Sequence, residues 1–359
     1  MIFYWGLWCF FFFAALLWRK KNYKQSYNIL LLLIFILAVL AGGREDVGAD
    51  WESYQIYYNT GYAFDKVSGR MEPLFELLRI ICFNLGFSYG LFCFVCCLLS
   101  LTVFYKAMKL LKINNCFLAF LVYLSLFFCN YQFNIIRHGI LASFVLLALS
   151  YLANNKTLKA LICVLIGSCF QVAGLVFVPL VFFMNKTCSK KAVFIIICVS
   201  FAFYLAGFSS KIVGFFPTLA AIDRISSYVD AGKDDVYKLS IGIIGFLCIA
   251  LYSFFFMNKE YEKQSSFRIM TNMLVCGFVF FCFFNGFSAL VQRIGNLMNL
   301  GVIVVLPFIL DNTKHKKRVI VLLLVTAYLA LYYPRTWNIA DESGNYSMLP
   351  FKCGITNLF

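Results

Sequence analysis

Long apolar runs separated by short polar segments dominate this sequence of 359 residues. A helix that crosses a bilayer needs about 20 mainly apolar residues, and such runs predict spans near 2–18, 28–43, 88–105, 115–131, 136–153, 192–208, 239–257, 267–286, 293–310 and 318–333. The run over 158–184 is longer, and Gly167, Gln171, Gly174 and Pro179 interrupt it. We interpret it as two short helices, 157–169 and 171–184, that meet at Gln171; one tilted or kinked helix is the alternative.

The pattern predicts an all-α integral membrane protein with about twelve transmembrane helices, of which one pair is short or broken near Gln171. We expect residues 1–359 to form a single polytopic membrane domain. The composition agrees, since 62% of the residues are hydrophobic and 13% are charged, against about 45–50% and 25% in soluble domains. The fifteen cysteines lie mostly inside apolar runs, where free Cys behaves as a small hydrophobe, so no disulfide framework is expected.

Charge sorts the predicted loops into two sets. If loops alternate between the two sides, one set holds nineteen of the 31 Lys and Arg residues and three of the 16 acids: 19–27, 106–114, 154–160, 185–191, 258–268 and 311–318. Cytoplasmic loops are rich in Lys and Arg, which places this set inside the cell and both termini in the periplasm. A single span over 157–184 would reverse that order downstream. The net charge of +15 therefore reflects membrane topology and does not indicate a nucleic-acid partner.

Three external segments are long enough to carry chemistry: the loops 44–87 and 209–238 and the tail 334–359. The first begins with a dense polar cluster from Arg44 to Tyr54, which includes Asp46, Asp50 and Trp51. On a helix, Asp50 and Tyr54 would share a face, because residues four apart are neighbours. The competing interpretation is a solvated loop with an interfacial aromatic belt.

Glu72 and Pro73 mark the start of a second element in the same loop. Proline suits the first helical turn and acidic groups suit a helix N-terminus. Glu72, Glu76 and Arg79 would then lie on one side and leucines on the other. This pattern predicts a short amphipathic helix at the membrane interface, with simple membrane anchoring as the alternative role.

External arginines suggest an anionic ligand, because the planar guanidinium fits phosphate oxygens. Arg137 opens the predicted span over 136–153, Arg293 begins the one over 293–310, and Arg224 lies in the loop 209–238. Snorkelling or intramembrane ion pairing is the alternative. His138, beside Arg137, is a candidate for proton transfer. No P-loop, dinucleotide motif or metal-ligand spacing is present in the sequence, so we expect no cofactor and no metal.

The order of these motifs resembles the EpsG/Wzy family of polysaccharide polymerases. The motifs that carry the resemblance are Arg44-x3-Gly48-x-Asp50-x3-Tyr54, Glu72-Pro73-Leu74-Phe75-Glu76, Arg137-His138-Gly139-x2-Ala142, Phe170-Gln171-Val172-Ala173-Gly174-Leu175 and Arg293-Ile294. The resemblance covers most of the chain. It departs from the family at two positions, since the family often has Gln where this chain has His138, and His where it has Gln171.

The resemblance implies a polymerase of O-antigen or similar capsular repeat units in the bacterial inner membrane. Such an enzyme transfers a glycan from undecaprenyl pyrophosphate onto a new lipid-linked unit at the periplasmic face. Asp50 is then the first candidate for the general base, with Glu72 second and His138 a further catalytic candidate. Expected substrate-binding residues are Arg44, Asp46, Trp51, Tyr54, Arg137, Gln171, Arg224 and Arg293.

The expected partners are the undecaprenyl-pyrophosphate-linked oligosaccharide, the lipid bilayer, and candidates from the same pathway, namely a chain-length regulator and a flippase. Two other functions fit the same span pattern. A flippase for the lipid-linked oligosaccharide should carry charges deep inside its spans, whereas the spans here are nearly free of charge. A ligase that moves the glycan to another acceptor is not distinguished from a polymerase by the sequence.

Overall fold

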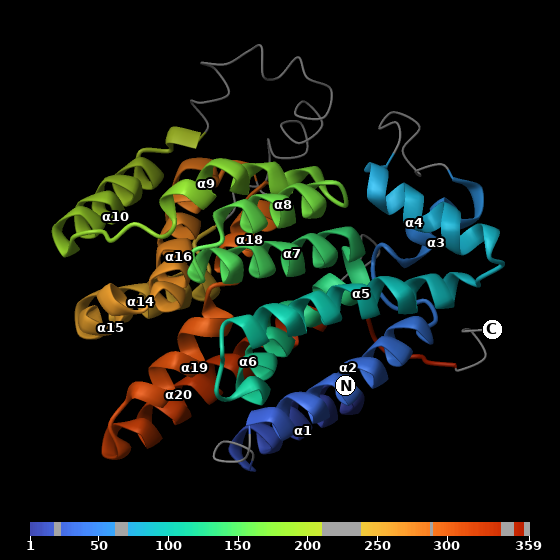
Figure 1. The fold of residues 1–359 in the computed structure, drawn as a ribbon, viewed down its shortest axis with the longest axis horizontal. Helices are drawn as coiled ribbons and strands as arrows, with labels where there is room; N and C mark the ends of the chain where they lie inside the picture. The colour runs from blue at the N-terminus through green and yellow to red at the C-terminus, as the bar shows by residue number, and fades with distance from the viewer. Residues whose placement is uncertain (18–22, 62–70, 210–237, 288–289, 339–347, 355–359) are drawn as a thin grey trace. The chain divides into compact units, whose positions relative to one another are not determined.

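The computed structural model describes residues 1–17, 23–61, 71–209, 238–287, 290–338 and 348–354 (Figure 1). Within these residues the regular structure is helical, and extended backbone pairs in one antiparallel bridge between Arg44 and Cys353. The chain divides into two compact units, which comprise residues 1–178 with 306–359, and residues 179–305. The single-domain organisation stays a prediction, and each unit is described by itself.

The first unit is built around α5, which packs between α2 and α7 (Figure 1). α8 packs on the other side of α7, and α1 packs against α6. The apolar helices that form the body of this unit are α1 (Ile2–Leu17), α2 (Tyr23–Gly42), α5 (Tyr89–Leu110), α6 (Cys116–Tyr123), α7 (Ile136–Ala153), α8 (Thr157–Ser168) and α20 (His315–Tyr332). Small hydroxyls occupy the α5–α7 contact, where Ser100 donates to Gly139 O at 3.0 Å and lies 3.0 Å from Ser143 Oγ.

Further helical elements connect these helices. Two π-helices, η1 (Leu124–Phe128) and η2 (Asn130–Asn134), lead into α7, and π-helices are rare and often found at functional sites. The others are α3 (Trp51–Thr60), α4 (Pro73–Asn84), η3 (Val172–Val176) and α21 (Pro334–Trp337), while α9 (Phe177–Phe183) and α19 (Val302–Asn312) cross from one unit to the other. Helix α4 is the short helix predicted to start at Pro73, and α3 begins directly after Asp50.

The second unit centres on α16 (Ser265–Phe284), which packs against α10 (Lys190–Leu205) and α14 (Ile241–Phe256). Its smaller elements are α15 (Asn258–Lys263), η4 (Val291–Gly295) and α18 (Asn296–Asn299). Buried Asn272 fixes the segment before α10, because its amide donates to Met184 O at 2.8 Å and to Lys186 O at 2.9 Å. These bonds satisfy main-chain carbonyls where the chain is not helical.

Six described helices are long and apolar enough to cross a membrane: Lys24–Gly42, Tyr89–Leu110, Ile136–Ala153, Ser265–Phe284, Val291–Asn312 and Lys317–Trp337. Shorter apolar helices cover Ile2–Leu17, Cys116–Phe128, Thr157–Ser168, Val172–Phe183 and Ile241–Phe256. The protein is thus an all-helical, multi-pass membrane protein. The count of twelve spans is not confirmed, because several of the predicted spans are helices shorter than the roughly 20 residues that a full crossing needs.

The interrupted run over 158–184 is broken at Gln171, as predicted. α8 ends at Ser168, Gln171 has an extended backbone with φ −158° and ψ 117°, and the 3₁₀-helix η3 starts at Val172. Because the extended backbone at Gln171 separates two helices, the alternative of one tilted or kinked helix is wrong. The break leaves main-chain groups available to other side chains, and one of them is used at the candidate site.

Candidate functional site

The loop after α2 is shaped by Gly48 and held by η2. Gly48 has φ +115°, and a Cβ there would collide with the main-chain oxygen of Phe133, so only glycine fits this close approach. The next residue, Ala49, donates its N–H to Asn134 Oδ1 at 2.6 Å. Gly48 and Ala49 therefore hold the loop against η2, the element that leads into α7.

This turn buries Arg44, which is 2% exposed. Its guanidinium donates to Ala41 O at 2.5 Å, to Val47 O at 3.2 Å and to Cys93 Sγ at 3.7 Å. It also lies 5.6 Å from the ring centroid of Phe133. None of the described carboxylates forms an ion pair with it, so main-chain carbonyls and a ring face stabilise the buried charge.

The chain's C-terminal segment covers the same loop. Glu45 N donates to Lys352 O at 3.1 Å and Gly354 N donates to Gly43 O at 2.9 Å, which makes the bridge noted above. Phe351 stacks on Phe3 of α1 with centroids 3.8 Å apart. Part of the predicted external tail is thus structural support for the Arg44 loop.

A cavity of about 240 Å³ lies beside Arg44. Helix α3 contributes Trp51 and Gln55, and the start of α5 contributes Ser88 and Tyr89. The Trp51 and Tyr89 rings meet edge to face at 5.5 Å, and Tyr89 donates its hydroxyl to Trp51 O at 3.1 Å. We call this space the Arg44 cavity; it combines two aromatic rings with amide, hydroxyl and guanidinium groups.

A second cluster joins Arg137, Glu72 and Tyr54, from α7, the start of α4 and α3. Arg137 Nη1 donates to Glu72 Oε2 at 2.6 Å and Arg137 Nε donates to Tyr54 Oη at 3.4 Å. The guanidinium also lies 6.0 Å from the Tyr54 ring and 5.9 Å from the Phe75 ring. The side chains of Arg137 and Glu72 are 22% and 12% exposed, so the ion pair is largely shielded from water. We call these three residues the Arg137 cluster.

Local sequence explains why Glu72 is available for this pair. It is the N-cap residue of α4 with Pro73 in the first turn, and its side chain makes no capping hydrogen bond. Its other oxygen, Oε1, accepts the N–H of Val172 at 3.3 Å, just after the helix break. Leu74 N also donates to Cys169 O at 3.0 Å. The break at Gln171 and the start of α4 therefore hold each other in place.

Gln171 lies at this junction with a buried side chain, 6% exposed. Its Oε1 has no hydrogen-bond partner among the described residues. A buried acceptor without a donor costs about 1–3 kcal/mol, which marks this oxygen as a group able to accept a donor from outside the chain.

A third network, of Glu76, Tyr57 and Arg79, lies along α4. Arg79 pairs with Glu76 at 2.6 Å and donates to Tyr58 O at 3.3 Å, while Tyr57 donates its hydroxyl to Glu76 Oε2. Burial alone would raise the pKa of Glu76, but hydrogen bonds from Arg79 and Tyr57 outweigh it and lower that pKa. This network was not among the predicted site residues; its one sequence signal is the i,i+3 spacing of Glu76 and Arg79.

An aromatic core packs against the Arg137 cluster and the Glu76 network. Tyr54, Tyr57 and Tyr58 are buried against Phe75 and Phe92, and the Tyr58 and Phe92 rings stack at 4.9 Å. Burial raises the pKa of Tyr54 above its ordinary value and that of Tyr58 to about 12. Both phenols therefore stay protonated at neutral pH, and Tyr54 can donate a hydrogen bond while it accepts one from Arg137.

The other predicted site residues of the first unit lie around these groups. Asp50 is the N-cap residue of α3, makes no side-chain capping bond and is close enough to Tyr54 to influence its ionisation. Asp46 is exposed and has φ +51°. His138 is buried against Tyr131, with ring centroids 5.5 Å apart, and makes none of the bonds within the Arg137 cluster.

The structure does not test two of the predicted arginines against this arrangement. Arg224 lies outside the described residues. Arg293 lies in η4 of the second unit, so it is described separately from Arg137. The structure brings together Tyr54, Glu72 and Arg137, together with the break at Gln171, from four segments that are distant in sequence.

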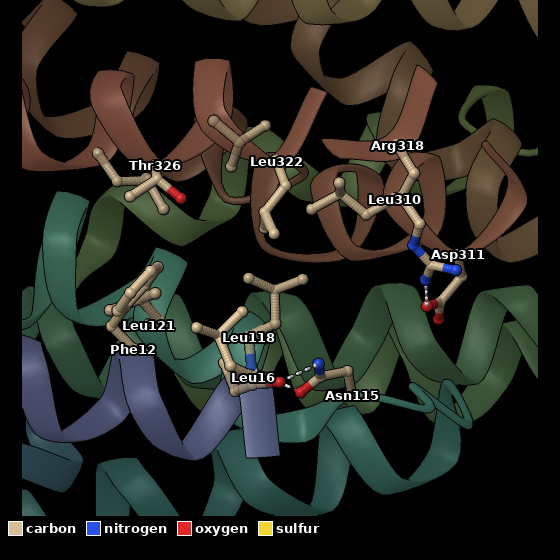
Figure 2. A pocket seen from close by; sticks show the side chains of 13 residues that line it. Phe12, Leu16, Asn115, Leu118, Leu121, Leu310, Asp311, Arg318, Leu322 and Thr326 are labelled. Atoms are coloured by element: carbon tan, nitrogen blue, oxygen red, sulfur yellow. Dashed lines mark hydrogen bonds and ion pairs between the residues drawn. The ribbon is translucent and has the colours of Figure 1, made fainter. Parts of the chain in front are cut away.

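A different arginine–carboxylate pair lies elsewhere in the first unit. Arg318 of α20 pairs with Asp311 at 3.1 Å, at the edge of an apolar pocket that Leu16, Leu118 and Leu322 help to line (Figure 2). Asn115 caps α6 in the same pocket and donates to Ala15 O at 2.9 Å. The Arg318–Asp311 pair lies in the predicted cytoplasmic loop 311–318 and provides a matched control for the Arg137–Glu72 pair.

Comparison with known families finds that residues 27–353 match a model described as the EpsG family. No curated protein and no solved structure matches the chain significantly. The matched range contains the Arg44 cavity, the Arg137 cluster and the break at Gln171.

Proposed function

The chain belongs to the EpsG family, and from this membership we propose that it polymerises lipid-linked oligosaccharide repeat units. In this reaction an acceptor hydroxyl attacks the anomeric carbon of a glycan carried on undecaprenyl pyrophosphate. The new glycosidic bond forms as the bond to the pyrophosphate oxygen breaks, and the hydroxyl proton passes to a base. The proposed location is the periplasmic face of the bacterial inner membrane, and the product is O-antigen or a similar surface polysaccharide.

The observation that carries this proposal is the Arg137–Glu72 ion pair in a partly buried setting. The leaving pyrophosphate gains charge in the transition state, and preorganised donors at that position lower the barrier. Arg137 has five N–H donors, and its bonds to Glu72 and Tyr54 engage Nη1 and Nε. The remaining donors, on a side chain that is 22% exposed, are oriented by those two bonds and can bind phosphate oxygens.

Asp50 suits the role of general base better than Glu72 does. Both oxygens of Glu72 already accept hydrogen bonds, one from Arg137 and one from Val172 N. We assign Glu72 the role of positioning Arg137. Asp50 is the N-cap residue of α3, the short helix that carries Tyr54, and it is close enough to Tyr54 to influence that phenol's ionisation.

The remaining predicted residues keep supporting roles in the proposal. Gln171 would accept a hydrogen bond from the substrate through its unsatisfied Oε1, and Trp51 would contact sugar rings. Arg224 and Arg293 remain further candidates for the anionic carrier, His138 for proton transfer and Asp46 for substrate binding. A chain-length regulator and a flippase of the same pathway are the proposed protein partners.

Deletion of the gene tests the proposal against its alternatives. If the gene encodes a polymerase, its deletion leaves the flippase and the ligase active. The expected surface glycan is then a core that carries a single repeat unit. Loss of all attached units would instead fit a flippase or ligase and contradict a polymerase. Complementation with the wild-type chain should restore the ladder of long chains.

Residue variants test the same proposal within the protein. Arg137→Ala should remove long chains although the protein still inserts into the membrane. Arg318→Ala breaks an ion pair of the same type at Asp311 and should leave the ladder intact. If both variants gave the same ladder of long chains, Arg137 would have no role in the reaction.

A further inference from the structure

The Arg44 cavity offers a different chemistry from the Arg137 cluster. We propose that it binds one sugar ring of the acceptor repeat unit through the ring's hydroxyl groups, and that it is not a phosphate site. This inference rests on the proposed function and assigns the cavity to the acceptor. Five observations support it: the free donors of Arg44, the amide of Gln55, the charges at the cavity, the aromatic rings and the size.

Arg44 retains hydrogen-bonding capacity after its protein contacts are counted. Guanidinium has five N–H donors, and the three bonds to Ala41 O, Val47 O and Cys93 Sγ leave two. Arg44 is 2% exposed, and its three hydrogen bonds fix the orientation of its guanidinium beside the cavity. A fixed fork of donors suits two neighbouring hydroxyl oxygens of a sugar.

Gln55 supplies the complementary polarity. Its side-chain amide can both donate and accept hydrogen bonds. Among the residues that the structure describes, none forms a hydrogen bond with this amide. It projects from α3 one turn after Trp51, and both side chains line the cavity. Sugar hydroxyls also donate and accept hydrogen bonds. A guanidinium that donates and an amide that does both can therefore bind neighbouring hydroxyl groups of one sugar ring.

The charges around the cavity favour a neutral ligand. Glu45 lines the same space as Arg44, so the cavity is bordered by one acidic and one basic side chain, and the carboxylate is exposed. A pyrophosphate would meet repulsion from Glu45, since like charges at short range oppose binding. A hydroxylated sugar ring does not meet this repulsion and can bond to both groups.

The aromatic side chains and the volume limit the ligand to about one ring. Trp51 is half-buried, and the Tyr89 ring stands at 80° to it, so two apolar surfaces meet at a corner where the C–H face of a sugar can pack. The cavity volume of about 240 Å³ lies below the range of about 300–1,000 Å³ typical for drug-sized ligands. A complete repeat unit would extend beyond it.

A binding experiment on the full chain in lipid nanodiscs tests this site. The probe is the repeat-unit oligosaccharide released from its carrier by mild acid, which keeps the sugars but lacks lipid and pyrophosphate. Saturation-transfer difference NMR should show transfer to protons of the terminal sugar at the non-reducing end. Gln55→Ala should reduce that signal at least fivefold, whereas Gln25→Ala, an exposed glutamine at the start of α2, should leave it unchanged.

Competition separates a sugar site from a phosphate site. Excess inorganic pyrophosphate should leave the oligosaccharide signal in place, and so should Arg137→Ala. Displacement by pyrophosphate, or equal signals from Gln55→Ala and Gln25→Ala, would overturn the proposal.

The outcome is independent of turnover, so it can be separated from failure of the proposed function. A signal that depends on Gln55 in a protein whose deletion does not affect chain length would keep the sugar site and reject the polymerase. Normal polymerisation with a signal that ignores Gln55 would keep the polymerase and reject the site.

Discussion

Arg44 and Arg137 are both shielded from water, yet their charges are stabilised in different ways. Arg137 pairs with the Glu72 carboxylate at 2.6 Å. Arg44 is 2% exposed and bonds to carbonyls and a thiol, with no ion pair to a described carboxylate. Loss of one member of a buried pair leaves an uncompensated charge, whereas replacement of an isolated buried charge by an apolar group removes a desolvation cost. The two regions should therefore respond oppositely to substitution.

Arg137→Ala should have the largest effect, because it removes the proposed contact with the substrate and the ion-pair partner of Glu72. We expect polymerisation to fall by about 100-fold or more, as when one preorganised donor is removed from an active site. Removal of one partner of a fully buried pair costs about 3–5 kcal/mol of stability, and we expect a smaller loss here because Arg137 and Glu72 are 22% and 12% exposed. The measurements are chain-length analysis and thermal unfolding in detergent.

A double variant separates these two effects. Arg137→Met with Glu72→Gln removes both charges, so it should recover much of the lost stability while chains stay short. Recovery of long chains in this double variant would show that Arg137 acts through stability alone.

Arg44→Met should give the opposite combination. An apolar side chain of similar length removes the buried charge, so the unfolding temperature should stay the same or rise. Polymerisation should drop about tenfold, in line with the loss of one hydrogen-bonded contact to a charged group, worth about 1.5–3 kcal/mol. A marked loss of thermal stability with full activity would contradict this interpretation of Arg44.

Gly48→Ala should have a smaller effect and tests how the Arg44 loop is held. A Cβ at Gly48 meets the Phe133 carbonyl, so the loop must shift, at a cost of about 1–3 kcal/mol. Gly86→Ala is the matched control, because Gly86 also has positive φ, +73°, but open space around it. Both variants place alanine at positive φ, but +115° at Gly48 is further from the left-handed helical region than +73° at Gly86, so a larger loss in Gly48→Ala reports the contact together with the less favourable backbone. Identical behaviour would remove the proposed role of Gly48.

Glu76→Gln should have the smallest effect at neutral pH and a visible one in acid. The hydrogen bonds from Arg79 and Tyr57 lower the folded-state pKa of Glu76. Its contribution to stability is therefore present above the unfolded pKa of about 4.3 and is lost as pH falls through the lower folded value. Unfolding temperatures measured from pH 7 to pH 3 should fall less below pH 4 in Glu76→Gln than in wild type. Parallel curves would show that this network does not depend on the charge.

Local features of the site were predictable from the sequence. Pro73 after Glu72 predicts the start of α4, and the glycines and proline around Gln171 predict the break that the structure confirms. Both are short-range signals, because they depend on backbone preferences of neighbouring residues.

The pairings were not predictable, because they join distant segments. Glu72 and Arg137 are 65 residues apart, and no spacing rule links α4 to α7. The burial of Arg44 was also missed. A span-end arginine is expected to reach toward water, but the turn at Gly48 and the bridge to Cys353 cover it. Arg44 therefore belongs to a separate cavity, although the sequence grouped it with the other arginines.

Reconstituted polymerisation tests the central claim most directly. Lipid-linked repeat units extracted from the deletion strain are incubated with the purified chain in proteoliposomes, and both glycan length and released undecaprenyl pyrophosphate are measured. The account predicts a ladder of longer glycans, with one undecaprenyl pyrophosphate released for each new bond, in wild type and Arg318→Ala but not in Arg137→Ala. Movement of repeat units across the bilayer without any ladder, or a ladder that persists in Arg137→Ala, would contradict it.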